Sequence, residues 1–225
     1  MKTKQSILSI ILTMASLSGY AQADVLFKCP EFYANVEAHN ACKGTPKPRA
    51  KQIMALNHMN EDKEIQYQYV IPVKDSIDIE QFMSTVRNWG NVTFNKPDES
   101  LISSTTTMVE YEATLPNVAV YTGYMKSTII SASMFIRIDA KPDRIRITGR
   151  IKHYRLAQGS LAGPKAVLTL PGDVYPFKES SNEQSYAMAF INSNAQVQNT
   201  IHGFLEYINK NYAKQKEKEQ ADDDW

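Results

Sequence analysis

The side chains with the clearest chemical potential are cationic and lie close together, between residues 131 and 155. Arginine and lysine alternate there with isoleucine, so a β-strand would place the cations on one face and the isoleucines on the other. A guanidinium group binds carboxylate or sulfate through paired hydrogen bonds, and a neighbouring aromatic ring offers a surface for stacking. The candidate ligand-binding residues are therefore Phe135, Arg137, Arg144, Arg146, Arg150, Lys152 and Tyr154.

The two halves of this segment predict a β-hairpin whose loop is residues 140–143. With that loop, Asp139 lies opposite Arg144, where it can neutralise it, and Arg137 lies opposite Arg146. Like charges directly opposite each other are destabilising unless carboxylates compensate them. The second interpretation is therefore a solvated face, which Glu110 and Glu112 from a neighbouring strand partly neutralise. The predicted buried face consists of Met134, Ile136, Ile138, Ile145, Ile147 and Ile151.

Catalytic signatures are absent from the sequence. It contains no G-x-S-x-G, no H-E-x-x-H, no phosphate-binding P-loop and no G-x-G-x-x-G. The four histidines are scattered, and none has a second histidine or a carboxylate at ligand spacing on the same face. The sequence therefore favours a non-enzymatic protein and predicts no catalytic residue, no metal and no cofactor.

Two cysteines, Cys29 and Cys42, lie near the expected mature N-terminus. An even number of cysteines in an exported chain is typical of a disulfide, which is the prediction for this pair. The alternatives are a zinc site that adds His39 as a ligand and a catalytic cysteine paired with the same histidine. Zinc would need a fourth ligand, and a catalytic cysteine would need a third group to orient the histidine; neither is evident.

The first 23 residues have the pattern of a signal peptide. Lys2 and Lys4 precede an apolar stretch from Ile7 to Leu17, and small residues lead to a cleavage position after Ala23. The apolar stretch is too short to span a bilayer, so we expect no membrane anchor. The predicted location is the periplasm or the medium.

Composition limits the partners. The 25 basic residues become 23 once Lys2 and Lys4 are removed, against 24 acidic residues, so the mature chain carries a net charge of −1. A nearly neutral exported protein is not expected to bind nucleic acid. The partner we expect is an unidentified envelope or extracellular molecule.

The elements that must position the cations follow from periodicity. Residues 24–62 predict a helical segment with the disulfide, residues 63–213 an α+β domain, and residues 214–225 a disordered charged tail. Asp78 and Gln81 form a capping box for a helix that ends at Gly90. The other predicted elements are strands over 64–73, 105–115, 118–124, 127–139 and 144–155, a short strand from Val92, a turn at Pro116-Asn117, a long loop over 158–176, and a helix whose apolar stripe is Val197, Ile201, Phe204, Leu205, Ile208 and Tyr212. Consecutive strands and amphipathic helices predict a curved antiparallel sheet with helices on one face.

The hairpin also resembles that of a known family. Residues 131–139, the turn Lys141-Pro142-Asp143-Arg144, and the following strand through Tyr154 are similar to a secreted bacterial family of unknown function with a TATA-binding-protein-like fold. The acidic tail ending in Trp225 is also similar. The resemblance covers residues 64–212 and implies the fold, but it implies no activity, no site residues and nothing about DNA.

Two functional hypotheses follow. The first is a binding or interaction module that recognises an anionic ligand or an acidic protein surface through the arginine-rich sheet face. The second is a small-ligand carrier or hydrolase whose site lies between sheet and helices, near residues 158–176 and His153.

Overall fold

The computed structural model describes residues 26–57, 64–73, 76–94, 96–122, 127–159, 165–169 and 183–223. The predicted signal peptide lies outside these residues, so its removal and the export of the chain stay predictions.

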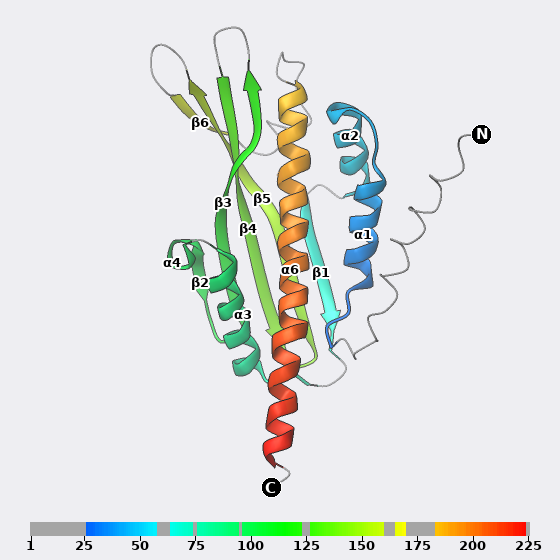
Figure 1. The fold of residues 1–225 in the computed structure, drawn as a ribbon, viewed down its shortest axis with the longest axis vertical. Helices are drawn as coiled ribbons and strands as arrows, with labels where there is room; N and C mark the ends of the chain where they lie inside the picture. The colour runs from blue at the N-terminus through cyan, green and yellow to red at the C-terminus, as the bar shows by residue number, and fades with distance from the viewer. Residues whose placement is uncertain are drawn as a thin grey trace, which may run out of the picture.

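One antiparallel sheet forms the centre of the molecule (Figure 1). Its hydrogen-bonded order is β1-β5-β4-β3-β2, and β6 pairs with the far half of β5. Strand β5 is long enough to pair with β1 near one end and with β6 near the other. The strands are β1 (Gln66–Pro72), β2 (Leu101–Ser104), β3 (Met108–Thr122), β4 (Ser127–Lys141), β5 (Arg144–Gly159) and β6 (Lys165–Thr169).

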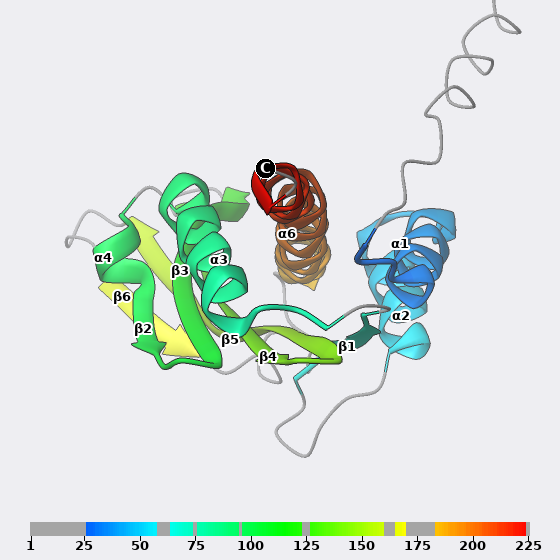
Figure 2. The ribbon, with the colours of Figure 1, turned by 90° about the horizontal axis from the view of Figure 1, so that it is seen from below.

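The main helices lie on one side of this sheet (Figure 2). Helix α6 runs the length of the sheet, with α3 on one side of it and the α1–α2 pair on the other (Figure 1). This two-layer arrangement confirms the predicted α+β class, with helices on one face. The helices are α1 (Pro30–Ala41), α2 (Pro46–Leu56), α3 (Ile79–Thr93), α4 (Pro97–Ser100) and α6 (Glu183–Asp223).

Helix α6 carries the predicted apolar stripe, and all six of its residues are buried. The helix is longer than the sequence predicted. It begins at Glu183 and continues through Asp223, so it includes residues for which we expected a disordered tail. The periodic stripe marked only part of the buried helix, since Ala187, Phe190 and Ile191, which precede it, are also buried.

Helix α3 begins as predicted. The Asp78 carboxylate accepts a hydrogen bond from the backbone N–H of Gln81, which is one of the free N–H groups at the helix start. The predicted end is wrong, because the helix passes through Gly90 and ends at Thr93. The predicted short strand from Val92 is wrong for the same reason.

Gly90 has a packing role instead of a capping role. A Cβ built at this position would lie 2.1 Å from Tyr111 Oη and 2.3 Å from Tyr111 Cζ. The Tyr111 ring cannot retreat easily, because it is buried and contacts the rings of Trp89 and Phe94. Only glycine lets helix α3 approach strand β3 this closely.

Two segments that the sequence predicted as a turn and a loop contain β-strand. Pro116 and Asn117 form a bulge inside the continuous strand β3, between Leu115 and Ala119, and Asn117 adopts a positive φ of 54°. An asparagine tolerates this conformation, so the chain continues along the same partner strand. The predicted loop over 158–176 is also partly wrong, since it contains β6; its residues 160–164 and 170–176 lie outside the described residues.

The predicted disulfide is wrong. Cys29 and Cys42 are both buried free thiols, and they cap opposite ends of helix α1. A helix rises about 1.5 Å per residue, so α1 separates the two ends by roughly 20 Å, whereas a disulfide requires Cα atoms within about 7 Å. Burial raises the pKa of the Cys29 thiol, which further disfavours the reactive thiolate.

Replacement of Gly90 by alanine is expected to lower the free energy of unfolding by about 2–3 kcal/mol, because the new methyl group collides with the Tyr111 ring. Gly203→Ala is the matched control: it lies within helix α6, and a Cβ there meets nothing within 4 Å. That variant should be stabilised by about 0.5–1 kcal/mol. Urea denaturation of both variants measures the difference, and equal effects would contradict the packing role of Gly90.

Candidate functional site

The hairpin between β4 and β5 is tighter than predicted. Lys141 pairs with Arg144, so the loop has only Pro142 and Asp143 in place of four residues. Every pair is therefore displaced by two positions from the predicted register. Since side chains alternate with a period of two, this displacement keeps each residue between the turn and Ile151 on its predicted face while changing its partner. The predicted buried residues, Met134, Ile136, Ile138, Ile145, Ile147 and Ile151, are all buried.

External hydrogen bonds hold this short turn. The Val73 amide donates to the Asp143 carbonyl and the Ile77 amide donates to the Pro142 carbonyl, each at 2.9 Å. Proline cannot adopt the positive φ that the most favourable two-residue hairpin turns require. The chain between β1 and α3 supplies bonds that compensate, and it fixes the hairpin tip against the rest of the molecule.

Asp139 links two of the candidate arginines on the open face. Arg146 lies opposite it and donates to it from Nε and Nη2 at 3.2 and 3.1 Å. Arg137, from the same strand, donates to it at 2.7–3.1 Å and also reaches Glu110 at 3.1 Å. Burial acts to raise the pKa of the Asp139 carboxyl, but the hydrogen bonds from both arginines outweigh it and hold that pKa below its usual value.

Two further candidates have internal partners. Arg150 donates to Glu64 at 2.9 Å, and its guanidinium lies 5.2 Å from the centre of the Phe135 ring. The side chain of Glu64 is only 10% exposed, so this pair belongs to the folded structure. The Phe135 ring thus stacks on the guanidinium of Arg150, so this face of the ring is not available to a ligand.

Lys152 is the third cation with an internal partner. Its ammonium donates to Glu112 at 2.7 Å, and the Ser133 hydroxyl also donates to Glu112. Burial acts to raise the pKa of Glu112, but the bonds from Lys152 and Ser133 lower it overall. The carboxylate therefore stays charged and keeps Lys152 on this partner.

Tyr154 is not on the cationic face. Ser133 pairs with His153 and Met134 pairs with Ile151, so Lys152 is an extra residue that forms a bulge. The bulge reverses the alternation and turns Tyr154 into the core, where it is 1% exposed and its hydroxyl is 2.7 Å from Ser193 Oγ. Its predicted place among the exposed ligand-binding residues is wrong.

Three cationic side chains line a cavity of about 330 Å³ at the hairpin end of the sheet. Arg144 and Arg146 line it, and their side chains are 51% and 44% exposed. Lys141 joins them, because the two-residue turn places it on strand β4 and not in the predicted four-residue loop. Its ammonium takes part in no salt bridge among the described residues. The other lining residues are Val70, Thr107, Asp139 and Ala140.

Charge in this cavity is unevenly compensated. Three cationic side chains line it with one carboxylate, Asp139, which already serves Arg137 and Arg146. Asp143 is 3.7 Å from Arg144 and is 69% exposed, so water screens this contact. The hairpin end of the sheet is therefore locally cationic.

A metal or nucleophilic centre is not formed by the candidates that the sequence offered. His39 is buried, and its two ring nitrogens lie 2.7 Å from Asn57 Nδ2 and 3.0 Å from Gln198 Nε2. Burial lowers the pKa of this imidazole, and its contacts are those of a structural side chain. Within the part of the chain that the structure describes, no cluster of three potential ligands could hold a metal ion.

Comparison with known proteins yields a fold likeness. No family model matches the chain, and no curated protein matches it. Among solved structures, the chain is similar to a TBP-like protein from Parabacteroides distasonis ATCC 8503, with 11% sequence identity and a TM-score of 0.43. The match covers 65% of this chain and 96% of that chain.

None of the helices in the described ranges is both long enough and apolar enough to cross a bilayer.

Substitution of Asp139 by asparagine is expected to lower the free energy of unfolding by about 1–2 kcal/mol at pH 7, because two arginines lose a shared charged acceptor. The pKa of Asp139 is lower in the folded than in the unfolded chain, so its contribution is present above about pH 4 and is lost as pH falls through the folded value. Urea denaturation at neutral and acidic pH should therefore show the wild type and the variant converging in acid. Asp143→Asn is the control, and an equal effect of both variants at pH 7 would contradict the proposed link.

Proposed function

We propose that this chain is an exported, non-enzymatic binding protein that recognises an anionic group, carboxylate or sulfate, at the hairpin end of its sheet. The observation that supports this proposal is the cavity where Lys141, Arg144 and Arg146 meet. Arginine forks and a lysine ammonium match the oxygen atoms of such anions in geometry and charge.

The site is smaller than the seven residues that the sequence suggested. Arg137, Arg150 and Lys152 are held by carboxylates, and Tyr154 is buried. If one of those cations turned to a ligand, a partly buried carboxylate would lose its partner. This costs more free energy than breaking an exposed ion pair. Arg144 and Lys141 can turn toward a ligand without breaking such a pair.

The shape of the cavity suits part of a larger molecule. Val70 is half exposed and lies in register with Arg146, so an apolar contact adjoins the cations. The partner we propose is therefore an envelope or extracellular molecule that presents acidic groups beside a carbon skeleton, such as an acidic glycan or the acidic edge of a protein.

Anion binding is tested with two probes, inorganic sulfate and a short polyglutamate peptide, titrated into the full mature chain and followed by NMR or calorimetry. The Lys141→Ser/Arg144→Ser variant should weaken binding about tenfold or more, since two charged contacts are lost. Binding should also weaken as ionic strength rises. Preference for the peptide would indicate a protein partner, and tight binding of sulfate alone would indicate a small anion or a glycan.

The matched control is Lys43→Ser/Lys51→Ser, which removes the same charge from exposed positions next to and within helix α2. It should bind both probes like the wild type. Equal weakening in the two double variants would show a non-specific effect of net charge. That result, or the absence of saturable binding to either probe, would refute the proposal.

A further inference from the structure

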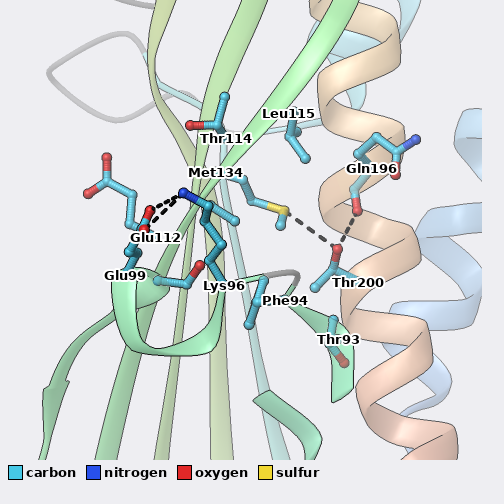
Figure 3. Close-up of a pocket in the computed structure, with 12 residues that line it drawn as sticks. Thr93, Phe94, Lys96, Glu99, Glu112, Thr114, Leu115, Met134, Gln196 and Thr200 are labelled. Carbon is cyan, nitrogen blue, oxygen red and sulfur yellow. Dashed lines mark hydrogen bonds and ion pairs between the residues drawn. The ribbon is translucent and has the colours of Figure 1, made fainter. Parts of the chain in front are cut away.

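A groove of about 390 Å³ lies beside strand β3, between the sheet and helix α6 (Figure 3). Four consecutive residues of β3, from Glu112 to Leu115, form one wall. Gln196 and Thr200 of α6 form the opposite wall, and Thr93 and Phe94 at the end of α3 lie below (Figure 3). A wall of consecutive residues means that the groove faces the edge of the strand, where its backbone groups are accessible.

Among the described residues, the edge of β3 has no partner strand at this point. Strand β2 pairs with β3 only as far as Tyr111, opposite Leu101, whereas β3 continues to Thr122. On the β2 side, the Met108 carbonyl accepts a hydrogen bond from the Thr105 amide. Alternate residues of an antiparallel strand direct their N–H and C=O groups to the same neighbour, so Thr114 faces the same side as Met108. No strand among the described residues pairs there.

The rest of this edge is closed. Pro116 has no N–H group to offer, and it is the first residue of the bulge. Beyond the bulge, Asn192 Nδ2 of α6 donates to the Val118 carbonyl at 2.8 Å, and Ser185 Oγ lies 3.5 Å from the Val120 carbonyl. Proteins usually protect free sheet edges in such ways. In the part of the chain that the structure describes, nothing covers the short stretch around Thr114.

The side chains around the opening indicate which segment would fit. A strand added to β3 would place alternate side chains against Phe94, Leu115 and Met134, which are apolar and line the groove. The charged groups nearby are paired with each other: Lys96 contacts both oxygens of Glu99 at 2.9 and 3.0 Å, and Glu112 is held by Lys152. These two pairs carry no net charge, so no excess charge in the groove attracts a charged side chain, and the groove favours a neutral one.

We infer that the groove beside Thr114 binds an extended, uncharged peptide segment of a partner protein, which adds to the sheet as a short strand next to β3. The Thr114 N–H and C=O would bind the peptide backbone, and the floor of Phe94, Leu115 and Met134 would receive one apolar side chain. Gln196 and Thr200 provide amide and hydroxyl groups along the opposite wall. This groove shares no lining residue with the anion cavity, so either proposal can fail alone.

The test uses a blocked peptide of about seven residues in which valine alternates with threonine and serine, a neutral pattern with high strand propensity. Its binding to the full mature chain is followed by fluorescence polarisation. Thr114→Pro removes the edge N–H without removing a bond to β4, and it should weaken binding about tenfold or more. Val120→Pro, at an exposed edge position of the same strand beyond the bulge, is the matched control and should bind like the wild type.

Two further arms keep the result interpretable. Gln196→Trp fills the groove from helix α6 and should weaken binding even if the proline variant folds poorly. A peptide methylated at the backbone nitrogen of its central valine cannot donate to the strand edge and should bind about tenfold more weakly. Equal binding of the methylated peptide, equal binding by Thr114→Pro and Val120→Pro, or self-association of the chain in place of peptide binding would overturn the inference.

Discussion

The packing of helix α6 on the sheet is the constraint on which the other elements depend. Its stripe of apolar side chains from Val197 to Tyr212 is almost completely removed from water, and each such side chain contributes about 1.5–3 kcal/mol. The sheet accommodates the helix at Gly149, where a Cβ would lie 2.7 Å from Val197 Cγ1. Close approach at this point allows α6 to follow the long axis of the sheet.

The same helix positions the other elements through its polar side chains. The Tyr212 hydroxyl accepts a hydrogen bond from the Asp78 amide at the start of α3. Asn209 exchanges two hydrogen bonds with the backbone of Phe27, and Gln198 donates to Asn35 in α1. These bonds join segments far apart in the sequence, so the core and its polar attachments are parts of one structure.

Helices on one face leave the other face to polar side chains, and the energetics of that face explain where a ligand can bind. An exposed ion pair contributes little, but a partly buried one is costly to break, because the remaining charge stays poorly solvated. Glu64, Glu110 and Glu112 hold three of the cations in this way. At the hairpin end of the sheet, beyond these pairs, Lys141 and Arg144 can change partner.

The features that sequence predicted well are those that depend on local periodicity. The stripe of α6, the Asp78 cap and the buried face of the hairpin all follow from side-chain spacing within one element. Features that depend on a neighbouring element were predicted poorly. Gly90 has the sequence pattern of a helix end, and only its contact with Tyr111 shows why a glycine is needed inside the helix. The cysteine spacing alone is compatible with a disulfide, but helix α1 lies between the two residues and keeps them apart.

The candidate site shows the same division within a single hairpin. Alternation assigned the faces correctly despite an error of two positions in the register, because such an error changes partners and leaves faces unchanged. The register itself depends on bonds from Val73 and Ile77 to the turn, which come from another part of the chain. One inserted residue has the opposite effect: the bulge at Lys152 moves Tyr154 from the open face to the core. Whether an arginine is free to bind a ligand depends on the partner of its side chain. The strand face alone therefore does not distinguish Arg144 from Arg137, and only the ion pairs in the structure do so.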